Sequence, residues 1–217
     1  MMNPSVLDRI LTTGIVAILR VDQSAKLIQV LAALKEGGVE AAEVTLTTPN
    51  ALSVIAQARE HFGSAMVIGV GTVLDPESAR AAITAGAQFV VCPTLRRATI
   101  KLCRRYSVPV LPGAYTPTEI LTAWEAGADI VKLFPAEIGG AAYLKAVKAP
   151  LPQIRIAPTG GVDEHTAADF LRAGASVLGV GSALVNQKLL AADNYAEISA
   201  RARRLRQIFD AHHAAQS

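Results

Sequence analysis

The sequence of 217 residues predicts an α/β fold, a (β/α)8 TIM barrel made of a single domain that spans residues 1–217. Three observations predict it: short apolar runs alternate with amphipathic segments, glycine-containing steps separate them, and no low-complexity linker interrupts the alternation. This pattern is typical of parallel strands joined by crossover helices. An open doubly wound sheet is the alternative. The lack of Gly-x-Gly-x-x-Gly after the first strand argues against its dinucleotide-binding form.

Eight apolar runs are the candidate strands, because each is long enough for a buried strand and too short for a helix. They are residues 15–20, 41–46, 66–71, 89–92, 108–111, 130–134, 154–157 and 177–180. Segments with 3.6-residue periodicity lie between them, for example 25–36 and 51–61. A short helix near residues 3–12 is expected before the first strand. Eight such units fit a closed barrel of roughly 200–250 residues.

The expected helices carry signals at both ends. A capping side chain before a proline marks a helix start, and a small-residue step with glycine supplies the left-handed residue that closes a helix. The starts are Thr48-Pro49, Asp75-Pro76 and Thr116-Pro117-Thr118-Glu119. The closing steps are Gly37-Gly38, Ala85-Gly86-Ala87, Ala126-Gly127-Ala128 and Ala173-Gly174-Ala175.

Composition narrows the classes of protein. Hydrophobic residues make up 51% of the chain and aromatic residues 5%, which suits a Val, Ile, Leu and Ala core around parallel strands. The net charge is +3, and the one local cluster, residues 201–206, has the spacing of a solvated helix face, so no nucleic-acid partner is expected. Cys92 and Cys103 are expected to be reduced thiols. Without a signal peptide or a run of ~20 apolar residues, a soluble, cytoplasmic protein with no membrane contact is expected.

Lys132 is the most informative residue. It lies in the apolar run Asp129-Ile130-Val131-Lys132-Leu133-Phe134-Pro135, whereas the other six lysines fall in segments expected to be helical. Lysine is rarely buried unless it is paired or functional. Burial favours the neutral amine, which attacks carbonyls and can form a Schiff base. The alternative is a lysine at a strand end that extends its amine to solvent.

A carboxylate is expected beside this lysine. Strand alternation places Glu43, Thr45 and Thr47 on one face, and Glu43 points into the barrel if the apolar face packs on the helices. A buried carboxylate is costly unless it is paired or catalytic, so an ion pair with an interior base is the alternative. A lysine and a glutamate in one interior supply a nucleophile and an acid/base partner.

Glycines and hydroxyls follow other strands. Gly71 would permit close backbone approach, and Thr72 would offer a hydroxyl to an anion or carbonyl. Glycine-rich loops follow the seventh and eighth strands, at Thr159-Gly160-Gly161 and Gly181-Ser182. Loops at these positions of a barrel are the usual phosphate site, because their backbone N–H groups are open to oxyanions. No His, Asp or Glu cluster converges at strand ends, so no metal and no cofactor is expected.

These motifs resemble a known family. They match, in order, those of class I 2-keto-3-deoxy-6-phosphogluconate (KDPG) / 4-hydroxy-2-oxoglutarate (KHG) aldolases, over residues 11–184. The matching segments are Glu43-Val44-Thr45-Leu46, Gly69-Val70-Gly71-Thr72-Val73-Leu74, Cys92-Pro93, Leu111-Pro112-Gly113, Val131-Lys132-Leu133-Phe134-Pro135-Ala136, Pro158-Thr159-Gly160-Gly161-Val162 and Gly181-Ser182.

The resemblance implies a set of roles. Lys132 would form the Schiff base with the keto acid, and Glu43 would be the general acid/base. Thr72 would help to hold the substrate carboxylate, and Pro93 and Phe134 would form walls of the pyruvate pocket. The distal phosphate would lie against Thr159, Gly160, Gly161, Gly181 and Ser182. The products would be pyruvate and an aldehyde, glyceraldehyde 3-phosphate or glyoxylate, and the protein would be a homotrimer without a cofactor.

One position departs from the family pattern. The phosphogluconate-specific members carry an arginine four residues after the glutamate, and this chain has Thr47 there, which cannot act as a bidentate carboxylate clamp. Arg20 resembles the arginine of galactonate-type members and is the candidate to supply that charge, with Thr47 kept as a binding candidate. The alternatives are a 2-keto-3-deoxy-6-phosphogalactonate aldolase, a phosphate-binding isomerase or epimerase without an imine, and a non-catalytic sugar-phosphate binding protein.

Overall fold

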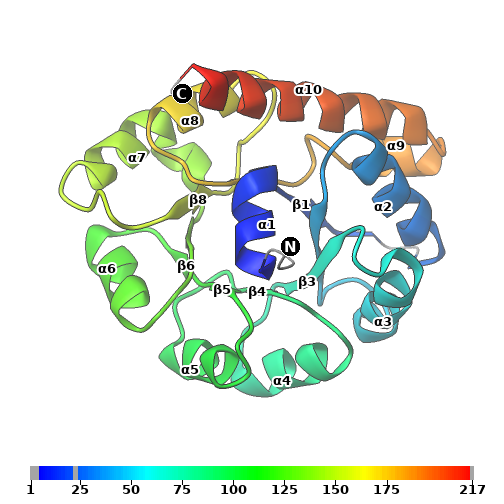
Figure 1. The fold of residues 1–217 in the computed structure, drawn as a ribbon, viewed down its shortest axis with the longest axis horizontal. Coiled ribbons are helices and arrows are strands. Elements are labelled where there is room, and N and C mark those ends of the chain that lie inside the picture. The colour runs from blue at the N-terminus through cyan, green and yellow to red at the C-terminus, as the bar shows by residue number, and fades with distance from the viewer. Residues whose placement is uncertain (1–4, 22–23, 216–217) are drawn as a thin grey trace.

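The computed structural model describes residues 5–21 and 24–215 and has an α/β fold with a curled sheet of parallel strands (Figure 1). One sheet has the strand order β5-β4-β3-β2-β1-β9 and a second has the order β6-β7-β8. The strands are β1 (Ile15–Leu19), β2 (Ala41–Thr45), β3 (Val67–Gly71), β4 (Val90–Val91), β5 (Val110–Leu111), β6 (Gly113–Ala114), β7 (Val131–Leu133), β8 (Ile156–Pro158) and β9 (Leu178–Val180).

Helices surround the strands in Figure 1, and α1 lies in the centre of that view. The α-helices are α1 (Val6–Thr13), α2 (Leu27–Glu36), α3 (Ala51–Phe62), α4 (Pro76–Thr84), α5 (Arg97–Arg105), α6 (Pro117–Glu125), α7 (Gly140–Lys148), α8 (Ala167–Arg172), α9 (Gln187–Ala191) and α10 (Tyr195–Ala214). Two 3-10 turns, η1 (Ser24–Lys26) and η2 (Ala136–Ile138), precede α2 and α7.

Each of the eight predicted runs coincides with a strand, and β8 extends one residue beyond its run, to Pro158. The fifth run continues beyond its predicted end at residue 111, because β6 follows β5 after Pro112. Proline has no N–H to donate, which interrupts a ladder of hydrogen bonds without ending the extended chain. An isolated parallel bridge between Thr159 and Gly179 connects the β8 end of the smaller sheet to β9 of the larger one.

The core has two layers. The larger layer lies between the strands and the helices and includes Ala42 and Val44 of β2. The smaller layer lies inside the curled sheet, where Ala41 of β2 and Ile130 pack with Ile10 of α1. Alternation along the strands produces this division, since neighbouring side chains point to opposite faces. Helix α1 therefore covers the N-terminal ends of the strands and closes the interior there.

The helix-start predictions are confirmed at two positions and wrong at one. Asp75 accepts a hydrogen bond from the Ser78 N–H at 2.6 Å, and Thr116 forms a capping box with Glu119. Helix α3 instead begins at Ala51, after Asn50 at φ 56°. Thr48 does not cap it, because its hydroxyl accepts the Val21 N–H at 3.5 Å while its own N–H donates to the Thr45 carbonyl at 2.9 Å, in the turn after β2.

The predicted glycines at the helix C-termini and the predicted N-terminal helix can also be compared with the structure. The predicted closing glycines have left-handed φ, between 86° and 103°, at Gly38, Gly86, Gly127 and Gly174. Helix α1 begins at Val6, because the Ser5 hydroxyl accepts the Asp8 N–H at 3.1 Å. The first part of the predicted helix, residues 3–4, lies outside the described residues.

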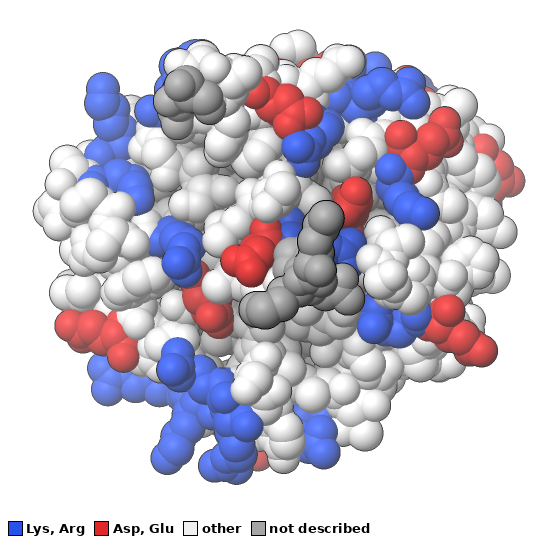
Figure 2. All heavy atoms as spheres, in the orientation of Figure 1, with Lys and Arg blue, Asp and Glu red and all other residues white. Residues whose placement is uncertain are grey.

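Charged side chains are unevenly placed on the α1 face. In Figure 2, Lys and Arg side chains gather at the lower left, where Figure 1 places α5, a helix that carries Arg97, Lys101, Arg104 and Arg105. The arginine-rich segment 201–206 lies instead on α10. Among the described residues, no helix has the length and apolar character needed to cross a membrane.

Candidate active site

Lys132 is buried in the centre of β7. Its exposed fraction is 6%, so an amine extended to solvent does not describe this side chain. The register places Lys132 opposite Gly113 on one side and Ala157 on the other. These two small neighbours leave space around a long side chain inside the sheet. The Lys132 Nζ lies 5.2 Å from the centre of the Phe134 ring.

Glu43 lies in the same interior. It is 1% exposed on β2, and it lines one small cavity together with Lys132. A side chain on Gly71 would place its Cβ 2.5 Å from the Glu43 Oε1, so glycine at that position makes room for the carboxylate. Burial raises the pKa of Glu43, and the positive charges of Lys132 and Arg20 oppose this rise.

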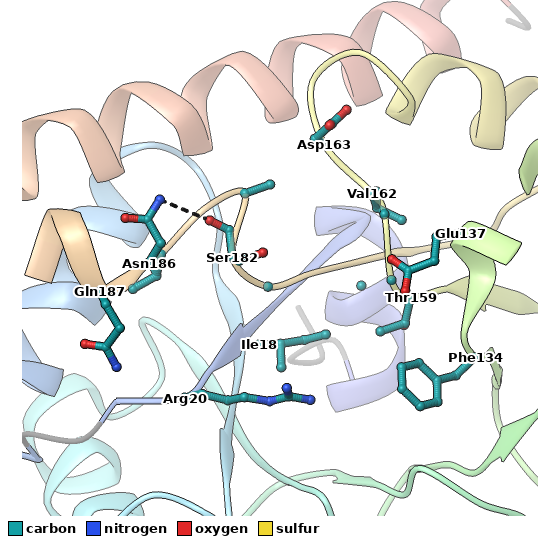
Figure 3. Close-up of a pocket in the computed structure, with 16 residues that line it drawn as sticks. Ile18, Arg20, Phe134, Glu137, Thr159, Val162, Asp163, Ser182, Asn186 and Gln187 are labelled. Atoms are coloured by element: carbon teal, nitrogen blue, oxygen red, sulfur yellow. Dashed lines mark hydrogen bonds between the residues drawn. The ribbon is translucent and has the colours of Figure 1, made fainter.

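A cavity of about 850 Å³ lies at the C-terminal ends of the strands (Figure 3). Seven predicted site residues line it: Arg20, Phe134, Thr159, Gly160, Gly161, Gly181 and Ser182. The large cavity and the small one share Ile18, Thr159 and Gly179 as lining residues. A ligand in the large cavity would therefore have its inner end near the lysine and the glutamate.

Two loops present backbone N–H groups at this cavity. After β8, Gly160 and Gly161 adopt φ values of 96° and 68°, a left-handed conformation that favours glycine. After β9, the N–H groups of Leu184 and Val185 donate to the Gly181 carbonyl at 2.9 and 3.1 Å, which forms one helical turn. Within the described chain, the N–H groups of Gly160, Gly161, Ser182 and Ala183 have no protein acceptor. Such open N–H groups bind oxyanions.

Comparison with known proteins identifies the family. The sequence model for KDPG and KHG aldolase matches residues 6–201. The chain belongs to this family. The family predicted from the sequence motifs is thereby confirmed, and with it the enzyme class, an aldolase.

Three relatives show how close the similarity is. The 2-dehydro-3-deoxy-phosphogluconate aldolase of Pseudomonas aeruginosa is 41% identical over 158 residues, which cover 72% of this chain and 71% of the relative. The 2-dehydro-3-deoxy-6-phosphogalactonate aldolase of Escherichia coli K12 is 36% identical over 171 residues, 78% of this chain and 83% of the relative. The KDPG aldolase of Legionella pneumophila, captured with pyruvate as a covalent carbinolamine, has a TM-score of 0.86 and 25% identity, covering 93% of this chain and 98% of that one.

Three of the residues predicted from the aldolase motifs, Thr47, Thr72 and Pro93, do not line either cavity. Thr72 follows β3 with φ 58° and is half-buried, and the Pro93 carbonyl lies against Gly113. The Thr47 hydroxyl is 2.8 Å from that of Thr45, which itself donates to the Leu19 carbonyl at 3.1 Å. A hydroxyl has one proton, so Thr47 donates to Thr45 and offers only lone pairs to a ligand.

The sequence analysis missed several residues that line the aldolase cavity. Glu137, Asp163, Asn186 and Gln187 were not predicted, although each follows the C-terminal end of a strand. Glu137 lies beside the glycine loop, where its Cβ is 2.6 Å from the place of a Cβ on Gly161. Figure 3 shows its carboxylate directed toward Thr159, whereas Asp163 points away from the cavity. The rule that strand ends carry function would have found Glu137, had it been applied beyond Phe134-Pro135.

The two cysteines are free and buried, and neither supplies a competing nucleophile. Burial raises the pKa of Cys92 to about 12 and that of Cys103 to about 12, so both remain thiols at neutral pH. Across the described ranges, no group of three His, Cys, Asp or Glu side chains is arranged to hold a metal ion.

Proposed function

We propose that this protein is a class I aldolase that cleaves a 2-keto-3-deoxy-6-phospho sugar acid, 4-hydroxy-2-oxoglutarate, or both, to pyruvate and an aldehyde. The observation that carries the proposal is the buried pair of Lys132 and Glu43 in one small cavity under a larger, open one. A buried amine beside a proton donor is what imine formation requires. The aldehyde is glyceraldehyde 3-phosphate from the phosphogluconate derivative and glyoxylate from the oxoglutarate.

The mechanism uses one nucleophile and one acid/base. Lys132 gives up a proton, its amine attacks the C2 ketone, and Glu43 supplies and removes the protons that convert the carbinolamine to an imine. The protonated imine then accepts the electron pair of the C3–C4 bond as Glu43 takes the proton of the C4 hydroxyl. The aldehyde leaves, Glu43 gives its proton to C3 of the enamine, and water hydrolyses the resulting imine to release pyruvate and the amine. A raised pKa suits Glu43 to this work because it brings the carboxyl nearer to working pH.

The phosphate end and the pyruvate end of the substrate contact different residues of the site. The phosphate lies against the open N–H groups of the loops after β8 and β9, with Thr159 and Ser182 beside it. Phe134 lies against the pyruvate part, and Pro93 and Thr72, which line neither cavity, keep only the roles that the family resemblance implies.

Arg20 binds the substrate carboxylate. Thr47 has its proton committed to Thr45, whereas Arg20 lines the cavity and extends toward Phe134 in Figure 3. Its charge also acts on the pKa of Glu43. The 36% identity to a phosphogalactonate aldolase keeps that C4 epimer as the second candidate substrate.

We further propose that the scaffold is one domain with eight strands in a closed barrel. Counting β5 and β6 as one strand gives eight. The Lys132 N–H donates to the Pro112 carbonyl at 2.9 Å and the Asp129 N–H to the Val110 carbonyl at 3.2 Å, which joins that strand to β7. The Ser176 N–H donates to the Ile156 carbonyl at 2.9 Å beside the bridge from Thr159 to Gly179. A homotrimer is the proposed assembly, and analytical ultracentrifugation tests it.

Trapping with borohydride tests the chemistry. The protein is incubated with pyruvate, reduced, digested and examined by mass spectrometry. We expect a pyruvate-derived mass increase on the peptide that contains Lys132 and none on the peptide that contains Lys145, an exposed lysine of α7. No adduct in folded protein would favour the non-covalent isomerase or the sugar-phosphate binding protein. Turnover of the two C4 epimers then ranks the substrates.

A further inference from the structure

Helix α10 is connected to both loops that present the open N–H groups. In Figure 3, α10 crosses above the loop that carries Asp163 and the loop that carries Ser182. A second cavity, of about 270 Å³, lies between α10 and these loops. The connections are therefore made by polar side chains that line this cavity as well as by apolar packing.

Arg201 makes the connection to the loop after β9. Its Nη1 donates to the Ala183 carbonyl at 3.0 Å, and its Nε donates to the Glu197 Oε1 at 3.0 Å. The guanidinium is therefore held at both ends, by the loop and by its own helix. Ala183 lies in the turn whose first N–H groups face the large cavity, so Arg201 fixes the backbone that orients them.

Arg204 makes the connection to the loop after β8. Its Nε donates to the Glu164 Oε2 at 2.6 Å, and its Nη2 donates to the Glu197 Oε1 at 3.1 Å. Glu164 is three residues beyond Gly161. Glu197 accepts from both arginines through the same oxygen, and hydrogen bonds from Arg201 and Arg204 hold its pKa below the usual range.

We infer that Arg201, Glu197 and Arg204 form a clamp that sets the distance and orientation of the two anion-binding loops, and that Arg201 is a positioning residue for the phosphate of the substrate. The inference rests on the proposed function, because it concerns the phosphate end of the same site. The clamp touches no substrate atom. It acts by keeping two sets of N–H groups convergent on one oxyanion, which neither loop does alone.

A role in binding is favoured over a role in overall stability. The side chains of Arg201, Glu197 and Arg204 are 28%, 35% and 43% exposed, and ion pairs at such positions contribute little to the free energy of unfolding. The loop after β8 is also held from within, since the Thr166 hydroxyl donates to the Gly161 carbonyl at 2.8 Å, so the clamp acts on where this loop lies relative to the loop after β9. Small displacements of donors weaken hydrogen bonds to a bound anion steeply.

The test compares Arg201→Gln with Arg203→Gln. Arg203 is on the same helix, is 55% exposed, and approaches only Glu36 at 3.8 Å among the described residues. For Arg201→Gln we expect the KM for KDPG to rise about tenfold, the value of one hydrogen bond, with kcat unchanged. The kcat/KM for 4-hydroxy-2-oxoglutarate, which has no phosphate, should not change. Arg203→Gln should match the wild type with both substrates.

Two further variants keep the test decisive. Arg201→Lys retains a donor for the Ala183 carbonyl and should recover part of the lost affinity, which also covers the case in which Arg201→Gln folds poorly. The double variant Arg201→Gln/Arg204→Gln should lose less than the sum of the single losses, because both arginines act through Glu197. Equal losses with both substrates, or an Arg203→Gln variant that loses as much as Arg201→Gln, would overturn the inference.

Binding of inorganic phosphate separates this inference from the aldolase proposal. Isothermal titration calorimetry needs no turnover and no imine. Weaker phosphate binding by Arg201→Gln than by Arg203→Gln supports the clamp even in a protein that forms no pyruvate adduct. Equal phosphate affinity in the two variants, or no phosphate binding by the wild type, overturns the clamp even in a protein that does form the adduct.

Discussion

The two ends of the curled sheet differ in almost every respect. At the N-terminal ends of the strands, α1 covers the interior, and the packed side chains are apolar, with Ile10 fully buried. At the C-terminal ends, the interior holds Lys132 and Glu43 and opens into the 850 Å³ cavity. The same strands form both ends, so the difference comes from which side chains point inward at each position along a strand.

This difference shows how stability and chemistry are separated within one interior. The apolar end excludes water and gains the transfer free energy of its side chains. The polar end buries two ionisable groups at a cost that packing elsewhere must offset. Ile130 and Lys132 occupy successive inward positions near β7, so the interior changes from apolar to ionisable side chains within two residues.

Removing the amine should have the largest effect on activity. Lys132→Met keeps the length of the side chain and removes the nucleophile, so we expect turnover to fall by on the order of 10³-fold or more and the borohydride adduct to disappear. Glu43 then loses a charge that opposes the effect of burial on its pKa, so some loss of stability is expected, and turnover is compared at a temperature where the variant is folded. Lys145→Met on α7 is the matched control. Residual aldol cleavage near the wild-type rate would show that Lys132 is not the nucleophile.

Replacing the carboxylate should separate imine formation from turnover. We expect Glu43→Gln to retain the trapped adduct on Lys132 but to lose about 10²–10⁴-fold in kcat, the usual contribution of a general acid/base. Steady-state rates and the trapping yield measured on the same preparation check this. A variant with full activity would remove Glu43 from the mechanism, and a variant without an adduct would give it an essential part in forming the imine.

A change at the apolar end should affect stability and not chemistry. Ile10→Ala leaves a cavity between α1 and the strands, and we expect the free energy of unfolding to fall by about 2–5 kcal/mol. The KM and kcat of the folded fraction should remain those of the wild type. Urea unfolding and kinetics at a temperature where the variant is folded provide the two measurements. A large change in KM would mean that the two ends are coupled.

The pH dependence of stability reports on the cost of Glu43. Its pKa in the folded protein lies above the ordinary value of 4.5, so above pH 4.5 the folded state holds a proton that the unfolded state has released. The free energy of unfolding therefore falls as pH rises from 4.5 toward the folded pKa. Glu43→Gln lacks this loss, so its stability relative to the wild type should increase over that window. Parallel stability curves for the two proteins would contradict this.

The sequence predicted which residues lie at the polar end, but not the tertiary contacts that they make there. The positions of the strands follow from the short apolar runs, the burial of Lys132 and Glu43 follows from their places in those runs, and the loops after β8 and β9 follow from the glycine positions. The N-cap of α3 was misassigned, because the Thr48 hydroxyl accepts the N–H of Val21, a contact between residues 27 apart that no local pattern reveals. Glu137 was missed because the rule that strand ends carry function was not applied beyond Phe134-Pro135, and only its position beside Gly161 depends on how two loops pack. The contact of Arg201 with Ala183 joins residues 18 apart and belongs to the same class of tertiary information.

Arg20 provides the finest test of how the polar end is arranged. Arg20→Ala should raise the KM for pyruvate exchange about tenfold, because one charge-assisted contact to the carboxylate is lost, and should change the KM for phosphate-bearing aldehydes much less. Arg97→Ala, an exposed position on α5, is the control. The same variant should raise the pKa of Glu43 further, since the charge that opposes the effect of burial is removed. The acidic limb of the pH–rate profile should therefore move to higher pH. That shift together with the higher KM would assign both carboxylate binding and the effect on the pKa of Glu43 to the Arg20 guanidinium. An unchanged pyruvate KM would leave the carboxylate without its proposed ligand and would return attention to Thr72.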